Sequence, residues 1–342
     1  ARGRAGAGAT GGAPVREELM KGKVCVFGSF NLDIVTKMSR FPLPGESLVA
    51  HSSMMGPGGK GSNQATAALR AGARVHYIGK VGNDDFGQFA RRHLEKTGFD
   101  AITLFTCKEK PTGNAMIYVA GDDAENMISV YPGANLTVTT AEVNRCQPTV
   151  AAADILLVQL ENNLSAIQRM VRNARQAGTY VIVNPAPWQK VSAAFLKNID
   201  LLTPNSTEAS QLTGIAVKDY ASAQRAAEAL HATGVRQLII TLGMQGALLS
   251  TEKYLAHIPV YPAQPVDSTG AGDSFNGALA ARLAAGEPLE QAALFASAYA
   301  SVCVERAGAA NAMPLYSDAI ARMQQYPELT VTFVEQVSAE AT

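Results

Sequence analysis

Short apolar runs alternate with amphipathic helical stretches along most of the chain. The runs are rich in Val, Ile and Leu, which is typical of parallel strands that are buried on both faces. Between them, stretches such as 166–178 and 223–234 repeat apolar residues with helical spacing and end on a glycine. The pattern therefore predicts an α/β fold with a mainly parallel central sheet. The predicted strands are residues 23–28, 74–79, 154–160, 180–184, 200–205 and 237–243.

A different pattern occupies residues 45–56 and 112–131. Here apolar and polar residues alternate over short spans, as in antiparallel strands with one face in water. Such strands do not fit a sheet that is buried on both faces. We therefore predict that they form a small sheet that projects from the main domain and serves as a lid or a dimer surface.

Composition delimits the folded domain. Residues 1–20 are rich in Ala, Gly and Arg without hydrophobic periodicity, which predicts a flexible N-terminal tail, with a transit peptide as the alternative. Residues 331–342 are predicted to be a C-terminal tail. The domain between them, 21–330, has enough apolar residues to bury a full core, since 47% of the chain is hydrophobic.

Charge and cysteine usage narrow the class of ligand and the compartment. Lys and Arg together number 29, as do Asp and Glu, so no broad electric field attracts nucleic acid or an anionic membrane. No window of the sequence is apolar for long enough to span a membrane. The cysteines at 25, 107, 146 and 303 form no CxxC pair, which favours reduced thiols. We expect a cytoplasmic protein with a small ligand.

Polar residues follow several of the predicted strands. Ligands of open α/β sheets bind outside the carboxyl ends of the strands, so we expect these side chains to converge on one edge. A turn or cap role accounts for any one of them alone, but the whole set indicates a binding site. The residues are Asn31, Asp33, Glu161, Asn184, Asn205 and Thr241.

The segment 264–286 contains the sequence GAG followed by a helical pattern that begins near Asp273. Successive glycines let backbone N–H groups point at one spot, and a helix N-terminus adds partial positive charge, so the segment predicts an anion site. A carboxylate placed there can remove a proton from an attacking hydroxyl, while the amides of Ala271 and Gly272 neutralise charge on the transferred group. A helix cap in a glycine-rich loop is the structural alternative.

The segment GPGGKG at 56–61 contains a GxGxxG pattern, which is typical of dinucleotide-binding turns. Such a turn follows a buried strand, whereas the residues before this segment are polar and alternating. Asp84 and Asp85 lie near the distance expected for a ribose-binding acid, so an NAD-dependent dehydrogenase stays an alternative. A Walker A loop is excluded, because the lysine is followed by glycine and not by Ser or Thr.

Two segments resemble the signatures of a known family. GGKGSNQ (Gly58 to Gln64) and DSTGAGD (Asp267 to Asp273) are similar to the two motifs of the ribokinase and phosphofructokinase-B (PfkB) carbohydrate kinases. Further segments fall in the family's order between about residues 23 and 325: GSFNLD, PGE, VQLE, NPAP, TPNSTEA and TLGMQG. The resemblance implies a ribokinase-like, three-layer α/β/α fold with a mainly parallel central sheet and a small projecting β-sheet lid.

The same resemblance implies an activity. The expected reaction is transfer of the γ-phosphate of ATP to the primary hydroxyl of D-ribose, with deoxyribose as the nearest alternative acceptor. Fructose, a nucleoside and a phosphorylated sugar are less favoured alternative acceptors. A catalytically silent sugar-binding regulator on the same fold is an alternative of another class, against which the intact GAG segment and Asp273 argue. The lid further suggests a homodimer in which two lids pair.

The resemblance also assigns roles at the sugar site. Asp273 is the expected catalytic base, and the anion hole is formed by Gly270, Ala271 and Gly272. The positions expected to hold the sugar, besides Asp273, are Asn31, Asp33, Gly59, Lys60, Gly61, Ser62, Asn63 and Glu161. The lid residues expected to cover it are Ala115, Ile117 and Val130.

ATP, Mg²⁺ and an activating K⁺ are the expected cofactors. The expected ATP-binding positions are Asn205, Thr241, Leu242, Gly243, Met244, Gln245, Gly246, Gly272 and Ser297. Glu208 is expected in the Mg²⁺ shell, with a capping box at the start of its helix as the alternative. The expected K⁺ positions are Asp267, Thr269, Cys303, Arg306 and Gly308. Ala312 stands where the family usually has a serine, so K⁺ activation is expected to be weaker or to involve a water molecule there.

Overall fold

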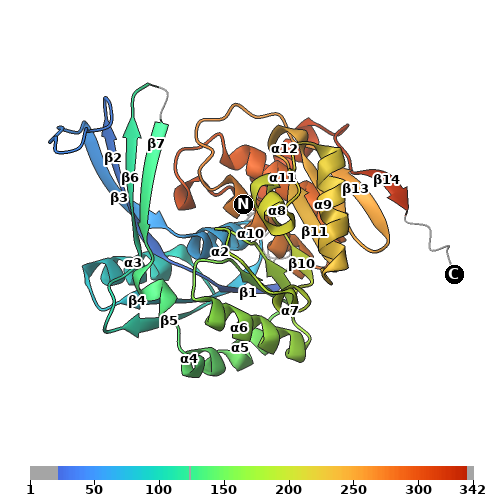
Figure 1. The fold of residues 1–342 in the computed structure, drawn as a ribbon, viewed down its shortest axis with the longest axis horizontal. Helices are drawn as coiled ribbons and strands as arrows, with labels where there is room; N and C mark the ends of the chain where they lie inside the picture. Colours follow the sequence, from blue (N-terminus) through green and yellow to red (C-terminus); the bar gives the residue numbers. More distant parts are fainter. Residues whose placement is uncertain (1–21, 123–124, 337–342) are drawn as a thin grey trace, which may run out of the picture.

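Two β-sheets organise residues 22–122 and 125–336, which the computed structural model describes (Figure 1). The larger sheet has ten strands in the order β14-β13-β12-β11-β10-β9-β8-β1-β4-β5. From β11 to β5 all neighbours are parallel, whereas β12, β13 and β14 add antiparallel pairs at one edge. The mainly parallel central sheet is therefore confirmed. Its strands in chain order are β1 (Lys23–Phe27), β4 (Arg74–Gly82), β5 (Ala101–Cys107), β8 (Ile155–Val158), β9 (Tyr180–Val183), β10 (Leu201–Leu202), β11 (Gln237–Thr241), β12 (Ala247–Ser250), β13 (Tyr254–Ile258) and β14 (Thr332–Gln336).

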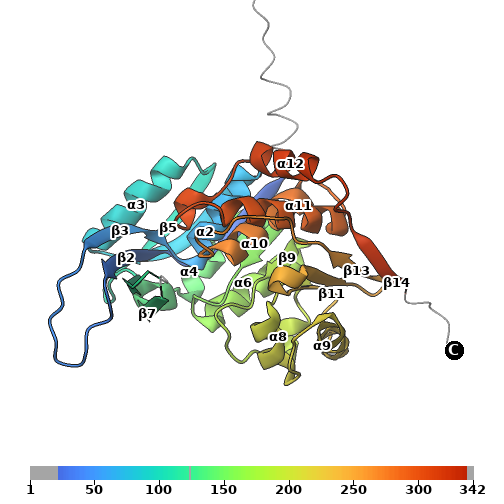
Figure 2. The ribbon, with the colours of Figure 1, turned by 90° about the horizontal axis from the view of Figure 1, so that it is seen from above.

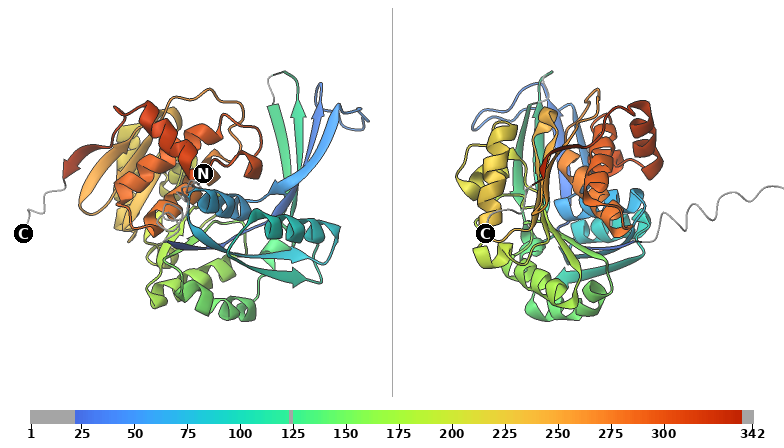
Figure 3. Two further views of the ribbon diagram at one scale, coloured as in Figure 1. Left: turned by 180° about the vertical axis from the view of Figure 1, so that it is seen from behind. Right: turned by 90° about the vertical axis from the view of Figure 1, so that its right-hand side faces the viewer.

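Helices cover both faces of this sheet and form the outer layers (Figure 3). Strand β1 shows why its sequence is apolar after Lys23: Val24 and Val26 enter one core, whereas Cys25 and Phe27 enter the core on the opposite face. One layer contains α2 (Lys60–Arg70), α3 (Asp85–Thr97), α10 (Ala271–Ala284), α11 (Leu289–Cys303) and α12 (Tyr316–Gln325). The other contains α4 (Thr140–Arg145), α5 (Gln147–Ala151), α6 (Leu164–Ala177), α7 (Ala193–Leu196), α8 (Ser206–Thr213) and α9 (Tyr220–Ala232). Short 3₁₀ turns are η1 (Gly133–Leu136), η2 (Gly243–Gln245) and η3 (Ala310–Ala312).

The smaller sheet projects from the main domain, and we call it the lid (Figures 1 and 2). Its strand order is β3-β2-β6-β7. The prediction of a projecting sheet is confirmed, but one of its strands was missed. The chain leaves β1 and, after residues 28–30, enters β2 as a lid strand, so Asn31 and Asp33 belong to the lid and not to a loop at the sheet edge. The lid strands are β2 (Asn31–Met38), β3 (Ser52–Gly58), β6 (Asn114–Ala120) and β7 (Glu125–Tyr131).

Two predicted boundaries were wrong. Residues 45–51 are not part of a lid strand, because this segment follows a Pro- and Gly-containing turn and pairing begins only at Ser52. The predicted C-terminal tail contains β14, which pairs antiparallel with β13 and packs the Phe333 ring against Tyr254 at 5.3 Å between centroids. The free edge of β13 is the pairing partner of β14, and the sequence pattern alone does not reveal this partner. The predicted N-terminal tail, 1–20, lies outside the described residues, as do residues 337–342.

The described structure also bears on the compartment and membrane expectations. All of the cysteines that the sequence contains are buried and unpaired in disulfides. Across residues 22–122 and 125–336, none of the helices is long and apolar enough to cross a bilayer.

Candidate active site

The carboxyl ends of the parallel strands carry a connected group of polar side chains. Gln159 follows β8, Asn184 follows β9 and Thr203 follows β10, and all of them are buried. Buried amides and hydroxyls need hydrogen-bond partners, and these residues find them in one another and in helices α2 and α10. The expected convergence at this sheet edge is therefore confirmed for Asn184, although its partners are protein side chains.

Glycines in the segment 58–61 let the start of α2 contact the end of β1. A Cβ on Gly61 would lie 2.3 Å from the carbonyl carbon of Gly28, and one on Gly58 would lie 2.2 Å from a carboxylate oxygen of Asp33. Side chains at these positions are thus excluded by close approach of backbone and carboxylate.

The dinucleotide interpretation of the same glycines has no structural support. The strand before them, β3, is an exposed antiparallel lid strand and does not belong to the parallel sheet. Asp84, one of the two aspartates on which the dinucleotide alternative rested, caps α3 by accepting from Gly87 N at 2.9 Å and also accepts from Thr112. This aspartate has a structural role at the base of the lid.

Carboxylates gather around the positions that were predicted to hold the sugar. Glu161 Oε1 accepts from Ser29 Oγ and from the backbone N–H of Lys60, each at 2.7 Å. Burial, followed by the charges of Glu161 and Asp273, raises the pKa of Asp33 to about 7. The pKa of Lys60 is raised as well, because the negative charges of Asp273, Glu161 and Glu208 favour its charged form more than burial disfavours it. The positive charge of Lys60 thus offsets part of the negative charge of these carboxylates.

Two asparagines offer opposite hydrogen-bonding groups. Asn31 Oδ1 accepts from Asn135 Nδ2 at 2.9 Å, so its own N–H groups are left to donate. Asn63 Nδ2 donates to Asp273 Oδ2 at 3.1 Å, and its buried Oδ1 has no partner among the described residues. A buried acceptor without a donor is costly, which suggests that a ligand hydroxyl supplies one.

Other predicted sugar positions support the site from behind. Ser62 is buried and donates its hydroxyl to Gly58 O at 2.7 Å, so its side chain is occupied within the protein. Gly59 is the N-cap of α2 with φ of 92°, a conformation that favours glycine. These positions shape the backbone next to Lys60 and Asn63.

Asp273 lies in the first turn of α10, with only 7% of its surface exposed. Its Oδ1 accepts from Gln64 Nε2 at 3.0 Å, and its Oδ2 accepts from Asn63. Both donors come from α2, which carries the other glycine motif. The structure therefore brings together the two segments on which the family resemblance depends, although they are more than two hundred residues apart.

The helix N-terminus beside Asp273 leaves amide groups available. Gly270 is the N-cap with φ of 79°. The Ala271 N–H, which was expected to neutralise the transferred group, instead donates to Ser268 O at 3.2 Å. The N–H groups of Gly272 and Asp273 have no intrahelical acceptor, because they belong to the first turn. A Cβ built on Gly272 would meet nothing within 4 Å, so the space beside this residue is open. The arrangement suits an anion at this spot.

The expected nucleotide positions gather around the ends of β10 and β11. Asn205 and Glu208 form a capping box at the start of α8, with Asn205 N–H donating to Glu208 Oε2 at 2.8 Å. Thr241 forms a bridge with Asn205, and η2 follows it with Met244 largely exposed. The capping-box alternative is thus present in the structure, and it occupies only one oxygen of Glu208.

Further nucleotide positions have mixed environments. Leu242 is buried, and Gln245 Nε2 donates to Lys218 O at 3.2 Å. Gly246 has φ of 82°, and a Cβ there would lie 2.2 Å from Ile258 O, so it serves the turn into β12. Ser297, on α11, donates to Pro259 O at 2.6 Å.

The expected cation positions come together at another point of the same region. Asp267 Oδ1 accepts from Thr269 N at 2.9 Å, and Oδ2 accepts from Gly308 N at 3.0 Å. The carboxylate therefore joins the loop before α10 to the loop after α11, which contains Arg306 and begins after Cys303, the last residue of α11. Hydrogen bonds from Thr269 and Gly308 hold the pKa of Asp267 below its usual value despite partial burial.

Strand register places the predicted lid residues on one face. Asp33 pairs with Ala115, and Ala115 pairs with Val130, so these residues form a row across the lid. Ile117 lies two residues further along β6 and therefore shares that face. The face that carries Asp33 thus also carries the apolar side chains expected to cover the sugar.

Several residues of the site escaped the sequence analysis as site residues. Ser29, Gln64 and Gln159 lie within motifs that were recognised, but nothing in the motifs shows where their side chains point. Asn135 follows the lid in η1, and its side chain bonds both the N–H and the carbonyl of Phe30. No sequence signal identifies it, because its partners are about a hundred residues away.

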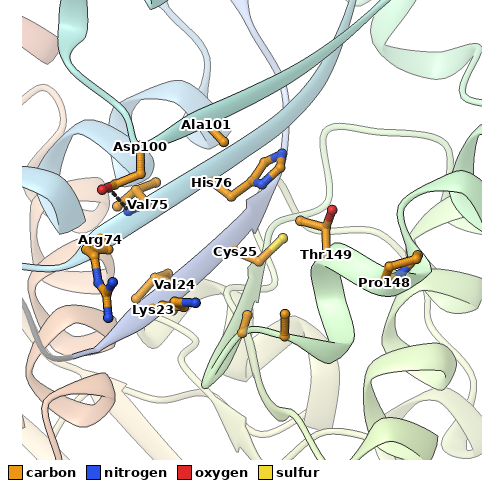
Figure 4. A pocket seen from close by; sticks show the side chains of 12 residues that line it. Lys23, Val24, Cys25, Arg74, Val75, His76, Asp100, Ala101, Pro148 and Thr149 are labelled. Atoms are coloured by element: carbon orange, nitrogen blue, oxygen red, sulfur yellow. Dashed lines mark hydrogen bonds between the residues drawn. The ribbon is translucent and has the colours of Figure 1, made fainter.

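A separate cavity of about 520 Å³ lies at the opposite edge of the sheet (Figure 4). It is lined by the first residues of β1 and β4, Lys23 and Arg74, and by Asp100, His76 and Thr149. None of the predicted site residues lines it. This cavity is therefore separate from the residues described above.

Comparisons with known proteins identify the relatives of this chain. The model of the pfkB family of carbohydrate kinases matches residues 21–315. A ribokinase of Haemophilus influenzae is 37% identical over 86% of this chain and 96% of its own length. A deoxyribokinase of Salmonella typhi is 30% identical over 85% of this chain and 95% of its own length. The structure of an Arabidopsis thaliana ribokinase with ribose and ATP has a TM-score of 0.80 and 29% identity, and covers 89% of this chain and 99% of that one.

Proposed function

The chain belongs to the pfkB family of carbohydrate kinases, and from this premise we propose that it transfers the γ-phosphate of ATP to the 5-hydroxyl of D-ribose. The products are ribose 5-phosphate and ADP. The observation that carries the proposal is the Asp273 carboxylate, which is held by Asn63 and Gln64 of the sugar motif beside free helix-terminal amides. A base and an anion site in contact with a pocket of hydrogen-bonding groups are the parts that phosphoryl transfer to an alcohol requires.

The reaction uses each of these parts in turn. Asp273 accepts the proton of the primary hydroxyl of the sugar while the oxygen of that hydroxyl attacks the γ-phosphorus. The bond between the γ-phosphorus and the bridging oxygen of ADP breaks in line with this attack. The N–H groups of Gly272 and Asp273 stabilise the charge on the transferred group. Movement of the lid over the sugar would exclude water, which would otherwise accept the phosphoryl group.

A pentose fits the hydrogen-bonding groups of the pocket. Ionised Asp33 accepts from two adjacent hydroxyls, Asn31 donates through its free N–H groups, and Asn63 Oδ1 accepts from another hydroxyl. Relatives named ribokinase at 34–37% identity support D-ribose as the acceptor. Relatives named deoxyribokinase at 30% identity make deoxyribose the second candidate.

Mg²⁺ binding is supported by the donors near the nucleotide. Glu208 uses one carboxylate oxygen in the capping box, which leaves the other for a water molecule of a hydrated Mg²⁺. Burial raises the pKa of Glu208, and a nearby cation would favour its ionised form. The metal would neutralise charge on the β- and γ-phosphates when bound.

A monovalent cation fits the loop pair joined by Asp267. Each Asp267 oxygen accepts one N–H and retains a further lone pair, and the carbonyls of Thr269, Cys303, Arg306 and Gly308 are hard oxygen ligands. The loop between Asp267 and Thr269 leads directly into the anion site, so a cation that orders it would favour catalysis. The buried Ala312 offers no hydroxyl, and we propose that K⁺ activation is accordingly modest.

An ADP-coupled assay tests the substrate and the cation together. We expect D-ribose to give the highest kcat/KM, with deoxyribose lower by about tenfold or more because one hydroxyl partner is missing. Fructose, nucleosides and phosphorylated sugars should react more slowly still. Replacing K⁺ by a large organic cation should lower the rate. Absence of ADP with every sugar would favour the sugar-binding regulator, and a nicotinamide absorbance change without ADP would favour the dehydrogenase.

We further propose a homodimer that forms through the lid. The lid exposes an unusual number of large apolar side chains: Met54, Met55, Met116, Tyr118, Met127, Ile128 and Val130. By strand register, Met55, Met116, Tyr118 and Met127 share the lid face opposite Asp33, whereas Met54, Ile128 and Val130 share the face that carries Asp33. Exposed apolar side chains on a projecting sheet favour pairing with a second copy. Light scattering at about micromolar concentration should give twice the chain mass of 35.9 kDa. A monomer under these conditions would contradict the proposal.

The proposed setting is the cytoplasm, with no nucleic-acid or membrane partner. Buried free thiols are typical of a reducing compartment, and equal numbers of acidic and basic residues create no field for a polyanion.

A further inference from the structure

Gln64, which the motif alone does not identify as a site residue, forms hydrogen bonds with three other side chains, including that of Asp273. It lies in α2 and is completely buried. Its Nε2 donates both to Asp273 Oδ1 at 3.0 Å and to Asn184 Oδ1 at 3.1 Å, and its Oε1 accepts from Gln159 Nε2 at 2.7 Å. A primary amide has two N–H groups, and Gln64 uses both. The Gln64 amide must place its NH₂ group toward Asp273, because an ionised carboxylate can only accept hydrogen bonds.

The hydrogen bonds continue beyond Gln64 and return to the Asp273 helix. Asn184 Nδ2 donates to Thr203 O at 3.1 Å, and the Thr203 hydroxyl donates to Asn276 Oδ1. Asn276 Nδ2 then donates to Gly272 O at 2.8 Å. Gly272 is the neighbour of Asp273, so the bonds form a closed ring. The ring connects the carboxylate and its own backbone to the carboxyl ends of β9 and β10.

Such a ring restricts the direction in which the carboxylate faces. Asn63 holds one oxygen and Gln64 holds the other, so rotation about the Cβ–Cγ bond of Asp273 would break a hydrogen bond. Asn63 is itself expected to contact the sugar, whereas Gln64 is enclosed by protein. Gln64 is thus the anchor that stays in place whether or not a sugar is bound.

We propose that Gln64 is a positioning residue for phosphoryl transfer, because it holds the Asp273 carboxylate in the orientation that receives the proton of the sugar hydroxyl. This inference rests on the proposed role of Asp273 as the base. Gln64 is fully buried among protein groups, so it acts through Asp273. Loss of orientation at a base lowers turnover more than it lowers binding.

The test compares Gln64→Met with a matched control. Methionine keeps the length and most of the volume of the side chain but removes its hydrogen bonds. We expect kcat to fall about 10- to 100-fold, with KM for D-ribose and for ATP within about threefold of the parent value. The control is Thr66→Val on the same helix. It removes a buried hydroxyl whose one hydrogen-bond partner among the described residues is Ser62 O. It should retain the parent kcat. Equal losses in the two variants, or a loss confined to KM, would overturn the inference.

A second variant covers the case in which Gln64→Met folds poorly. Gln64→Glu has the same shape, but its ionised carboxylate cannot donate to Asp273, whereas the protonated acid regains one O–H donor. We expect the variant to recover activity as the pH falls. The ratio of parent kcat to variant kcat should be at least about threefold smaller at about pH 6 than at about pH 8.5. A ratio that does not change with pH would contradict the positioning role.

The Asp273→Asn background separates this inference from the proposed function. If Gln64 acts only through the carboxylate, adding Gln64→Met to Asp273→Asn should lower the residual kcat by less than about twofold. Full multiplication of the two losses would contradict the positioning role. Parent turnover in Asp273→Asn itself would instead refute the assigned base, whereas a damaged Asp273→Asn with a normal Gln64→Met would refute the Gln64 inference alone.

Discussion

Asp273→Asn is expected to lower kcat by about 10²- to 10⁴-fold while the affinity for D-ribose stays within about threefold of the parent value. Asparagine keeps the shape of the side chain but cannot accept the proton of the attacking hydroxyl. The backbone amides of Gly272 and of the substituted residue still face the phosphoryl group, so some turnover should remain. Single-turnover kinetics measures the chemical step, and calorimetry with D-ribose measures binding.

The control for Asp273→Asn is Glu290→Gln. Glu290 lies in the first turn of α11, carries the same charge and bonds Tyr254 OH away from the site. This variant should turn over at the parent rate to within about twofold. If Asp273→Asn kept parent turnover in a preparation shown by mass spectrometry to contain no unmodified enzyme, another group would have to be the base.

Asp33→Asn is expected to reduce kcat/KM for D-ribose by about 10²- to 10⁴-fold. Asp33 would accept from two adjacent hydroxyls, and two hydrogen bonds to a charged group together contribute about 3–6 kcal/mol. Asparagine can accept through only one of its side-chain atoms. KM for ATP should change little. A variant that uses D-ribose as well as the parent enzyme would show that Asp33 does not face the sugar.

The same substitution should change how stability depends on pH. The pKa of Asp33 is raised from 3.8 to about 7 in the folded protein, so the native state binds more protons than the unfolded chain between these values. The stability that protonated Asp33 contributes to the folded state is therefore complete below about pH 4 and is lost as the pH rises through about 7. We expect Asp33→Asn to raise the melting temperature at about pH 8 and to change it little at about pH 4. A lower melting temperature at about pH 8 would contradict this electrostatic description.

Loss of a negative charge anywhere could in principle produce a similar shift. Glu95→Gln serves as the control, because Glu95 is exposed on α3. Its melting temperature should follow that of the parent at both pH values. The parent enzyme should also show a rise of kcat/KM for D-ribose through about pH 7, as ionisation makes Asp33 an acceptor only.

Much of the fold follows from local pattern. Strands buried on both faces must be apolar throughout, so β1, β4, β8, β9, β10 and β11 were visible in the sequence, and their polar ends indicated the ligand-binding edge. Strand β14 was missed because its stability depends on the free edge of β13, which lies some eighty residues earlier. Strand β2 was missed because its polar residues were interpreted as the end of β1.

The site shows the same division between motif and partner. Asp273 was identified from glycines and a helix start that lie next to it in the chain. Asn184 was predicted at the ligand edge, but in the structure its amide holds Gln64 and the Thr203 backbone. Glu208 was expected near the metal, and its capping box with Asn205 was visible only as an alternative. In each case the residue type limits which groups the side chain can bind, and its hydrogen-bond partner in the folded protein decides which of them it does bind.

The sequence by itself therefore determined the layers of the fold, the presence of a lid and the chemical groups available for phosphoryl transfer, because periodicity and glycine-rich turns act over a few residues. Only the tertiary structure decided which of those groups meet. Asn63 and Gln64 reach Asp273 across more than two hundred residues, and Asn135 orients Asn31 across about a hundred. Hydrogen bonds depend on distance and angle between side chains in space, and helix packing around the sheet sets both.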